Sequence, residues 1–320
     1  MIEPRKDAYG READTSHLAD YLELLALAGH PLKRANLSDY LADNDWPVRS
    51  RELFHAADPP GADTEPPEDA LESGPGPSPA DEAAGRVLDL VADRATVLGA
   101  RYPFLIDDVQ VTAADLVPEQ HDPYLALLAI TVAHHYQIAV PAAPERAFEA
   151  VVASAMAERG LVTVDMGEAG RAAGDFRDAV RTAGETIGVL PAPEAASTRE
   201  HANEEGVDTV SHLAWGDTRP GHWIFIGQAT CAQSSEWARK ITEPKPAQWA
   251  KLLGSAVPPI AYLAIPHHME SRHMLHISDR EGRLILDRLR LCRHLSVVSA
   301  DQAGIVEAVR SEEVFHPSLS

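Results

Sequence analysis

Three polar side chains near the middle of the chain have the types and spacing needed to hold a divalent cation. Asp208 follows Gly206 and Val207 at the start of one predicted strand, and Gln228 and Thr230 end a second predicted strand. Because residues two apart on a strand point to the same face, Gln228 and Thr230 share a face. A loop between the strands would bring Asp208 beside them. Carboxylate and neutral oxygens are the ligands that Mg²⁺ prefers in proteins.

The two predicted strands resemble the core of the PD-(D/E)XK nuclease superfamily. The match is to the variant of Mrr-like restriction enzymes, with Gly-(Ile/Val)-Asp on one strand and Gln-x-Lys on the next. The resemblance covers residues 144–300, and its specific part is confined to Gly206–Thr230. It implies catalytic positions at Asp208, Gln228 and Thr230, with Mg²⁺ or Mn²⁺ held by Asp208, Gln228 and Glu149 of an upstream helix. It also implies hydrolysis of DNA phosphodiesters in bacterial restriction or antiphage defence.

The chain departs from this family at one position, because Thr230 stands where the family has a lysine. A nearby lysine could replace it, and Lys240 is the best candidate, with Arg239 second. Thr230 could instead orient the attacking water in a slow or partner-dependent nuclease. The third alternative is a degenerate site in a domain that binds without cutting.

Each of these residues also has a purely structural interpretation. Asp208 could be a turn acid, since Gly and Asp mark the entry to strands. Gln228 could be a buried, hydrogen-bonded amide. Glu149 could be solvated on a helix surface, and Lys240 could be an ordinary surface lysine.

Several arginines and tryptophans are candidate contacts for nucleic acid. Arg219 lies in the loop between the two strands, and Arg239 lies close behind the second strand. Arg288 and Arg290 alternate on a predicted late strand, Arg283–Leu289, and would share a face. The tryptophans around the motif could stack on bases, although packing is the more common role; they are Trp215, Trp223, Trp237 and Trp249.

Histidines gather in His267–His276, which holds four of them and a Glu. Zinc can use such spacing, but structural zinc sites usually include Cys pairs that this segment lacks. A DNA-facing or solvated loop is the favoured interpretation. Cys231, directly after Thr230, has no His–Asp context of a nucleophile and is interpreted as a packed thiol.

The chain divides into five predicted regions. Residues 1–56 form a helical module compatible with a winged-helix unit, and we favour a protein-docking role because its second helix is acidic. Residues 57–82 form an acidic, Pro-rich linker that cannot bury enough apolar surface to fold. Residues 83–143 are mainly helical, 144–300 form an α/β domain with a restriction-endonuclease-like mixed sheet flanked by helices, and 301–320 are a tail.

Bulk properties restrict the class of protein. The sequence has no run of eighteen apolar residues and begins with polar residues, so we expect a cytoplasmic protein with neither membrane span nor signal peptide. Two cysteines are too few for a disulfide framework. The formal net charge is −21. Because neutralising phosphates supplies most non-specific DNA affinity, we expect weak DNA binding by the isolated chain, or a protein partner in a defence complex that brings the DNA.

Two functions of different class therefore remain open. The first is a metal-dependent DNA endonuclease. The alternative is a catalytically inactive nuclease-fold subunit that serves DNA binding or complex assembly. An accidental match in an unrelated α/β interaction protein would predict that Asp208→Ala changes no activity.

Overall fold

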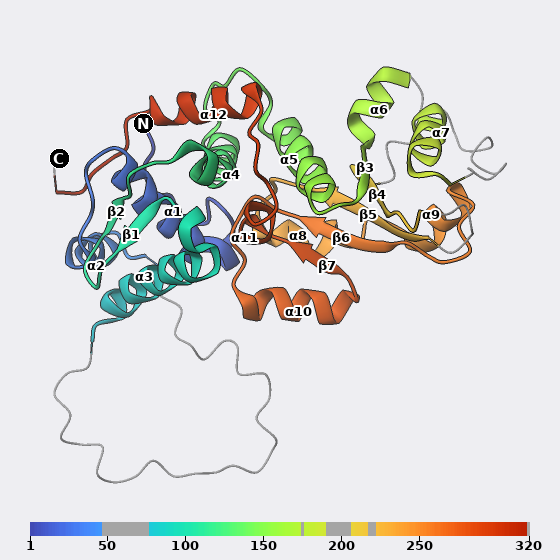
Figure 1. The fold of residues 1–320 in the computed structure, drawn as a ribbon. Coiled ribbons are helices and arrows are strands. Elements are labelled where there is room, and N and C mark those ends of the chain that lie inside the picture. The colour runs from blue at the N-terminus through green and yellow to red at the C-terminus, as the bar shows by residue number, and fades with distance from the viewer. Residues whose placement is uncertain (47–76, 174–175, 190–205, 217–221, 319–320) are drawn as a thin grey trace, which may run out of the picture.

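The structure, a computed structural model, describes residues 1–46, 77–173, 176–189, 206–216 and 222–318. Its described part is mixed α/β, with helices gathered around a two-stranded hairpin at one end and a five-stranded mixed sheet at the other (Figure 1). The expected α/β class is thus confirmed.

The first part of the molecule is a helical assembly with one shared core. Its elements are η1 (Arg11–Ala13), α1 (Asp14–Leu27), α2 (Arg34–Asp43), α3 (Pro79–Leu98), η4 (Gly99–Arg101), β1 (Phe104–Ile106), β2 (Val111–Ala113), α4 (Pro118–Tyr136), α5 (Pro144–Glu158) and α12 (Ala300–Arg310). Lys33, before α2, forms an isolated bridge to Gln110 of the β1–β2 connection. Three helices followed by such a hairpin are compatible with the winged-helix interpretation, but they extend well beyond residue 56.

This shared core changes two of the predicted boundaries. Residues from α1, α4 and α12 belong to one buried cluster, which includes Leu25, Leu128 and Ile305. Residues 1–46 are therefore packed with the helical region. The predicted tail 301–320 contains most of α12. After this helix, the carbonyl oxygen of Phe315 accepts a hydrogen bond from the Tyr21 hydroxyl at 2.5 Å. The two ends of the chain meet where Ile2 bridges Val314.

The predicted linker 57–82 also ends earlier than expected. Helix α3 begins at Pro79 because Ser78 caps it: the Ser78 hydroxyl accepts from the Asp81 N–H, and the Asp81 carboxylate accepts from the Ser78 N–H. Such a capping box satisfies backbone donors that a helix start otherwise leaves unpaired. Residues 57–76 lie outside the described part.

The five-stranded sheet carries the predicted motif at its centre. Its strands are β3 (Val162–Asp165), β4 (Thr209–Leu213), β5 (Trp223–Ala229), β6 (Ile260–Ala264) and β7 (Leu284–Leu286), in that order across the sheet. β3, β4 and β5 pair antiparallel, whereas β5, β6 and β7 pair parallel. The predicted strand pair around Asp208 and Gln228 is thus confirmed as β4 and β5.

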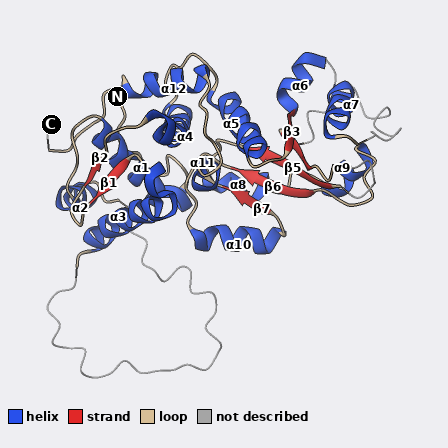
Figure 2. Ribbon diagram, in the orientation of Figure 1, coloured by secondary structure: helices blue, strands red, loops and turns tan. Residues whose placement is uncertain are grey.

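Helices cover both faces of this sheet (Figure 2). They are α5, α6 (Met166–Ala173), α7 (Phe176–Ile187), α8 (Ser234–Lys240), α9 (Pro246–Leu252), α10 (Ser271–Glu281) and α11 (Arg288–Cys292). Phe225 and Ala229 of β5 pack against the cluster that contains α5, whereas Ile226 packs with α7 and α9. Alternate residues of β5 therefore face different layers.

A buried network of charges joins the helical assembly to the sheet. Arg288 donates to both carboxylate oxygens of Asp20 at 2.7 Å, and Arg94 donates to Asp20 and Glu23 at 2.7 Å. All four side chains are at most 1% exposed. The two positive and two negative charges compensate each other, which buried ions require.

Within the described residues, no helix is both long and apolar enough to cross a membrane.

Candidate functional site

Asp208 directly precedes β4, and backbone hydrogen bonds hold it beside the last residues of β5. It follows Gly206, whose φ of 68° lies in the left-handed region that glycine adopts readily, and Val207, which is fully buried. The Asp208 N–H donates to the Gly227 carbonyl at 2.8 Å, and Asp208 Oδ2 accepts from the Ala229 N–H at 2.7 Å. The carboxylate therefore lies beside the Gln228–Ala229 peptide bond.

Gln228 is buried and only half satisfied. Its side chain is 5% exposed, and its Nε2 donates to Glu243 Oε2 at 2.5 Å. Its Oε1 is buried without a hydrogen-bond partner. Leaving a buried acceptor unsatisfied costs about 1–3 kcal/mol. Such an oxygen is suited to a cation or to a donor from a bound molecule.

Glu243 is the site residue that sequence reasoning missed. It lies in the turn after α8, and its Oε2 also accepts from Lys240 Nζ at 3.3 Å, while its Oε1 accepts from Arg239. Burial opposes ionisation of Glu243, but the hydrogen bond from Gln228 and the charges of Lys240 and Arg239 lower its pKa overall. The carboxylate is thus kept charged. Its signal in the sequence is weak, because a Glu three residues after a Lys is common on helices.

The structure brings Lys240 to this cluster and leaves Thr230 out of it. Lys240, about a quarter exposed, reaches Gln228 through the shared Glu243 carboxylate. Thr230 Oγ1 instead accepts from the Ala232 N–H at 3.1 Å, and the Thr230 N–H donates to the Ala264 carbonyl. Thr230 shapes the turn that leads from β5 into α8.

Glu149 lies on the other side of the sheet from the Gln228 side chain. It belongs to α5, whose Phe148 packs with Ala229, and Ala229 faces opposite to its neighbour Gln228. Burial, followed by the charges of Glu145 and Glu149, raises the pKa of the Cys231 thiol. The predicted metal ligand Glu149 is therefore placed near Cys231. The buried Cys231 fits the interpretation of a packed thiol.

The arginines predicted to contact nucleic acid differ in burial and in their partners. Arg288 and Arg290 lie on helix α11, because the late strand β7 ends at Leu286. Arg288 is completely buried against Asp20, so a nucleic-acid contact by this residue is wrong. Arg290 is exposed and donates to the Ile285 carbonyl at 2.5 Å. Arg239 is 59% exposed and pairs with Glu236 and Glu243. The predicted contact Arg219 lies outside the described residues.

The histidine segment is neither a loop facing solvent nor a zinc site in the described structure. His267 and His268 are buried, and His273 and His276 lie on α10. Among the described residues, no group of three or more His, Cys, Asp or Glu side chains is arranged to hold a metal ion, so this segment forms no zinc site of that kind. His267 Nε2 lies 3.2 Å from His135 Nε2, and both rings lie within 5 Å of Tyr9. The burial follows from contact with the N-terminal segment, which local sequence cannot reveal.

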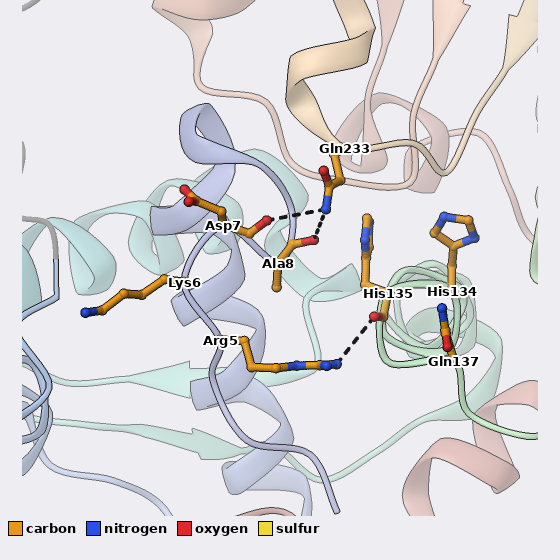
Figure 3. Close-up of a pocket in the computed structure, with 8 residues that line it drawn as sticks. All are labelled: Arg5, Lys6, Asp7, Ala8, His134, His135, Gln137 and Gln233. Carbon is orange, nitrogen blue, oxygen red and sulfur yellow. Dashed lines mark hydrogen bonds between the residues drawn. The ribbon is translucent and has the colours of Figure 1, made fainter.

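A cavity of about 430 Å³ lies beside His135. Its lining residues are Arg5, Lys6, Asp7, Ala8, His134, His135, Gln137 and Gln233. In Figure 3, the Gln233 amide donates hydrogen bonds to the carbonyls of Asp7 and Ala8, and Arg5 donates to the His135 carbonyl. The side chains of Lys6 and Asp7 point away from the histidines. The polar groups that face inward are thus largely engaged with one another.

The four tryptophans near the motif divide into two pairs. Trp237 and Trp249 are buried, as the packing interpretation predicts. Trp215 and Trp223 are 54% and 52% exposed, with ring centroids 5.1 Å apart, at the end of β4 and β5 away from Asp208. This exposed pair is available for stacking.

Comparison with protein-family models, curated proteins and solved structures found no match to this chain.

Proposed function

We propose that this protein is a metal-dependent DNA endonuclease whose site lies at the junction of β4, β5 and α8. One observation carries the proposal: Gln228 and Lys240 both donate to the Glu243 carboxylate, and the Asp208 carboxylate accepts from the backbone N–H of Ala229, the residue after Gln228. A core amide and a surface lysine with only structural roles would have no reason to share one carboxylate beside Asp208.

The order of elements supports the same proposal. A helix, α5, precedes three antiparallel strands, the first two of which are separated by α6 and α7. After β5 come α8, α9 and then β6, which runs parallel to β5. Helix, mixed strands, helix and strand is the order expected of a restriction-endonuclease-like core. The motif residues lie on the second and third of these strands.

The residues present fit a divalent cation. Asp208 offers a carboxylate, and Gln228 Oε1 is a buried oxygen that lacks a donor. Mg²⁺ usually keeps several waters and needs only one or two carboxylates from a protein. Asp208 and Gln228 would hold it, and when bound it would polarise a phosphate oxygen and lower the pKa of water.

Lys240 supplies the positive charge that the family expects from the position of Thr230. Its ammonium is held within hydrogen-bond reach of the carboxylate that also binds Gln228. A cation at this place would offset the negative charge that develops on a phosphate during hydrolysis. Arg239, which is 59% exposed on α8, would contact a neighbouring phosphate.

We propose a role in bacterial restriction or antiphage defence, together with a partner protein. The net charge of −21 is distributed unevenly, with −15 over residues 1–144 and −6 over residues 145–320. The half with the proposed site therefore repels DNA less. A partner that presents DNA would compensate for the remaining repulsion.

The deciding experiment is cleavage of plasmid DNA by the purified chain with Mg²⁺ or Mn²⁺. Asp208→Ala removes the proposed ligand, and Asp165→Ala serves as a control acid on β3. Cutting that is lost in the first variant and kept in the second supports the endonuclease. Cutting that both variants retain refutes this site. If the wild-type chain binds Mn²⁺ and DNA without cutting, the inactive-subunit alternative is favoured.

A further inference from the structure

The polar cluster at β5 contains a second carboxylate that the strand motif does not supply. Gln228 is neutral, so Asp208 is the only acid at the motif positions of the two strands. Glu243 lies in the turn after α8 and its carboxylate accepts from Gln228 at 2.5 Å. Since Mg²⁺ and Mn²⁺ favour carboxylate oxygens, this turn supplies the second carboxylate that the two strands lack.

The chain holds Glu243 in this position by close packing with the turn before Asp208. A Cβ atom added at Gly206 would lie 2.6 Å from Glu243 Cβ. Only a glycine permits so close an approach, and the positive φ of Gly206 demands glycine for a second reason. The backbone that presents Asp208 therefore also seats Glu243.

From this geometry we propose that Glu243 is a cation ligand, with Asp208 and Gln228 Oε1, and that cation binding transfers Glu243 away from Lys240. This inference rests on the proposed metal-dependent function. Gln228 is 5% exposed and its amide group points to Glu243, so its unpartnered oxygen belongs to the same cluster. Two carboxylates and one amide oxygen, completed by water, form a suitable set for Mn²⁺.

The charges of the cluster explain why Glu243 is needed. Glu236 neutralises Arg239 in an exposed ion pair, so Asp208 and Glu243 carry two negative charges against the single positive charge of Lys240. Without Glu243 the cluster is neutral and has no electrostatic attraction for a divalent cation. With Glu243, it retains one net negative charge beside the open amide oxygen.

The same contacts link the cation to the lysine. Glu243 Oε2 accepts from both Gln228 and Lys240, so a cation that takes this oxygen weakens both hydrogen bonds. Lys240 is then released close to the bound cation, where a phosphate would lie. The lysine is therefore paired in the protein alone and becomes available together with the metal.

Calorimetric titration of the full chain with Mn²⁺ tests the ligand role. We expect Glu243→Gln and Asp208→Ala each to weaken Mn²⁺ binding by at least tenfold. Glu236→Gln is the matched control, because Glu236 also pairs with Arg239 but does not contact Gln228; it should change binding by less than twofold. Glu243→Asp, one methylene shorter, provides a second variant with the charge retained, and circular dichroism checks folding.

The outcomes separate this inference from the proposed function. Loss in Asp208→Ala with wild-type affinity in Glu243→Gln overturns the role of Glu243 and leaves the metal site standing. Equal losses in Glu243→Gln and Glu236→Gln overturn it as well, because a general charge effect then suffices. Absence of Mn²⁺ binding by the wild-type chain overturns both proposals.

A chemical readout tests the release of Lys240. Mn²⁺ should increase the rate at which an amine-specific reagent modifies Lys240 by several-fold in the wild-type chain, as followed by peptide mass spectrometry. Lys251, on α9, serves as the internal control. A rate at Lys240 that Mn²⁺ leaves unchanged, in protein that binds Mn²⁺, contradicts the exchange of partners.

Discussion

Lowering the pH from 6.5 to 5 should destabilise this protein strongly, because its core contains neutral histidines. Burial lowers the pKa of His17 to about 4 and that of His135 to about 3, and it holds the pKa values of His267 and His268 well below their usual range. In the unfolded chain each of these groups titrates near 6.5. Between pH 6.5 and pH 5, the unfolded chain therefore binds protons at these histidines, whereas the folded protein does not.

The magnitude follows from linkage between proton binding and folding. A histidine that is neutral in the fold loses about 1.6 kcal/mol of stability between pH 6.5 and pH 5, since one pKa unit corresponds to about 1.4 kcal/mol. Four such groups give about 6 kcal/mol. The carboxyls of Asp287 and Glu270 act in the opposite direction, because burial raises their pKa values and the fold accepts their protons more readily. A net loss of about 3–6 kcal/mol is large against a typical total of about 5–15 kcal/mol.

The assay is urea denaturation followed by tryptophan fluorescence at pH 7.5, 6.5, 5.5 and 5. Trp237 packs against His267 and reports on the same core. His17→Phe should reduce the pH dependence by about one proton, whereas His276→Gln, at an exposed position on α10, should leave it unchanged. An unfolding free energy that is the same at pH 7.5 and pH 5 within about 1 kcal/mol would refute the neutral, buried state of these histidines.

Three further substitutions test other parts of the structure. Asp20→Ala should destabilise the protein by about 3–5 kcal/mol, because it leaves Arg288 without its buried partner; urea unfolding measures this, and a loss below about 1 kcal/mol contradicts the network. Lys240→Ala should abolish DNA cleavage while changing stability by less than about 1 kcal/mol, since its ion pair is partly exposed; near-normal cleavage eliminates the replaced-lysine hypothesis. Ser78→Ala should cost about 1 kcal/mol in thermal or urea unfolding through loss of the cap of α3, and an unchanged midpoint argues against that cap.

The local elements of the sheet could be predicted from the sequence with good accuracy. The segment Phe176–Ile187 forms α7 as expected, and the predicted strand from Ile260 to Ile265 is β6, which ends at Ala264. These segments carry clear periodicity, because one face of each packs against a neighbouring layer. The strand pair around Asp208 and Gln228 was likewise predictable from Gly and apolar spacing.

The errors concern residues whose partners lie far away in the chain. The sequence predicts Arg288 to be a nucleic-acid contact on a late strand, yet its partner is Asp20, 268 positions earlier. His267 reads as a loop histidine, yet it is covered by Tyr9 and His135. Local spacing carries no information about such contacts. For the same reason, local spacing does not reveal that the helices before residue 47 and after residue 76 share one core.

In the candidate site, the sequence indicated Lys240 but not Glu243. The hypothesis that Lys240 replaces the missing lysine required only that one turn of helix follow β5, and α8 meets that requirement. Glu243 could not be recognised, because its significance depends on the buried amide of Gln228 and on the close approach of Gly206. The strand supplies a neutral Gln, and the turn after α8 supplies the carboxylate of Glu243. Lys240 ends α8 and Glu243 follows three residues later. In the proposed site, a movement of the end of α8 would therefore change cation binding and the position of Lys240 together.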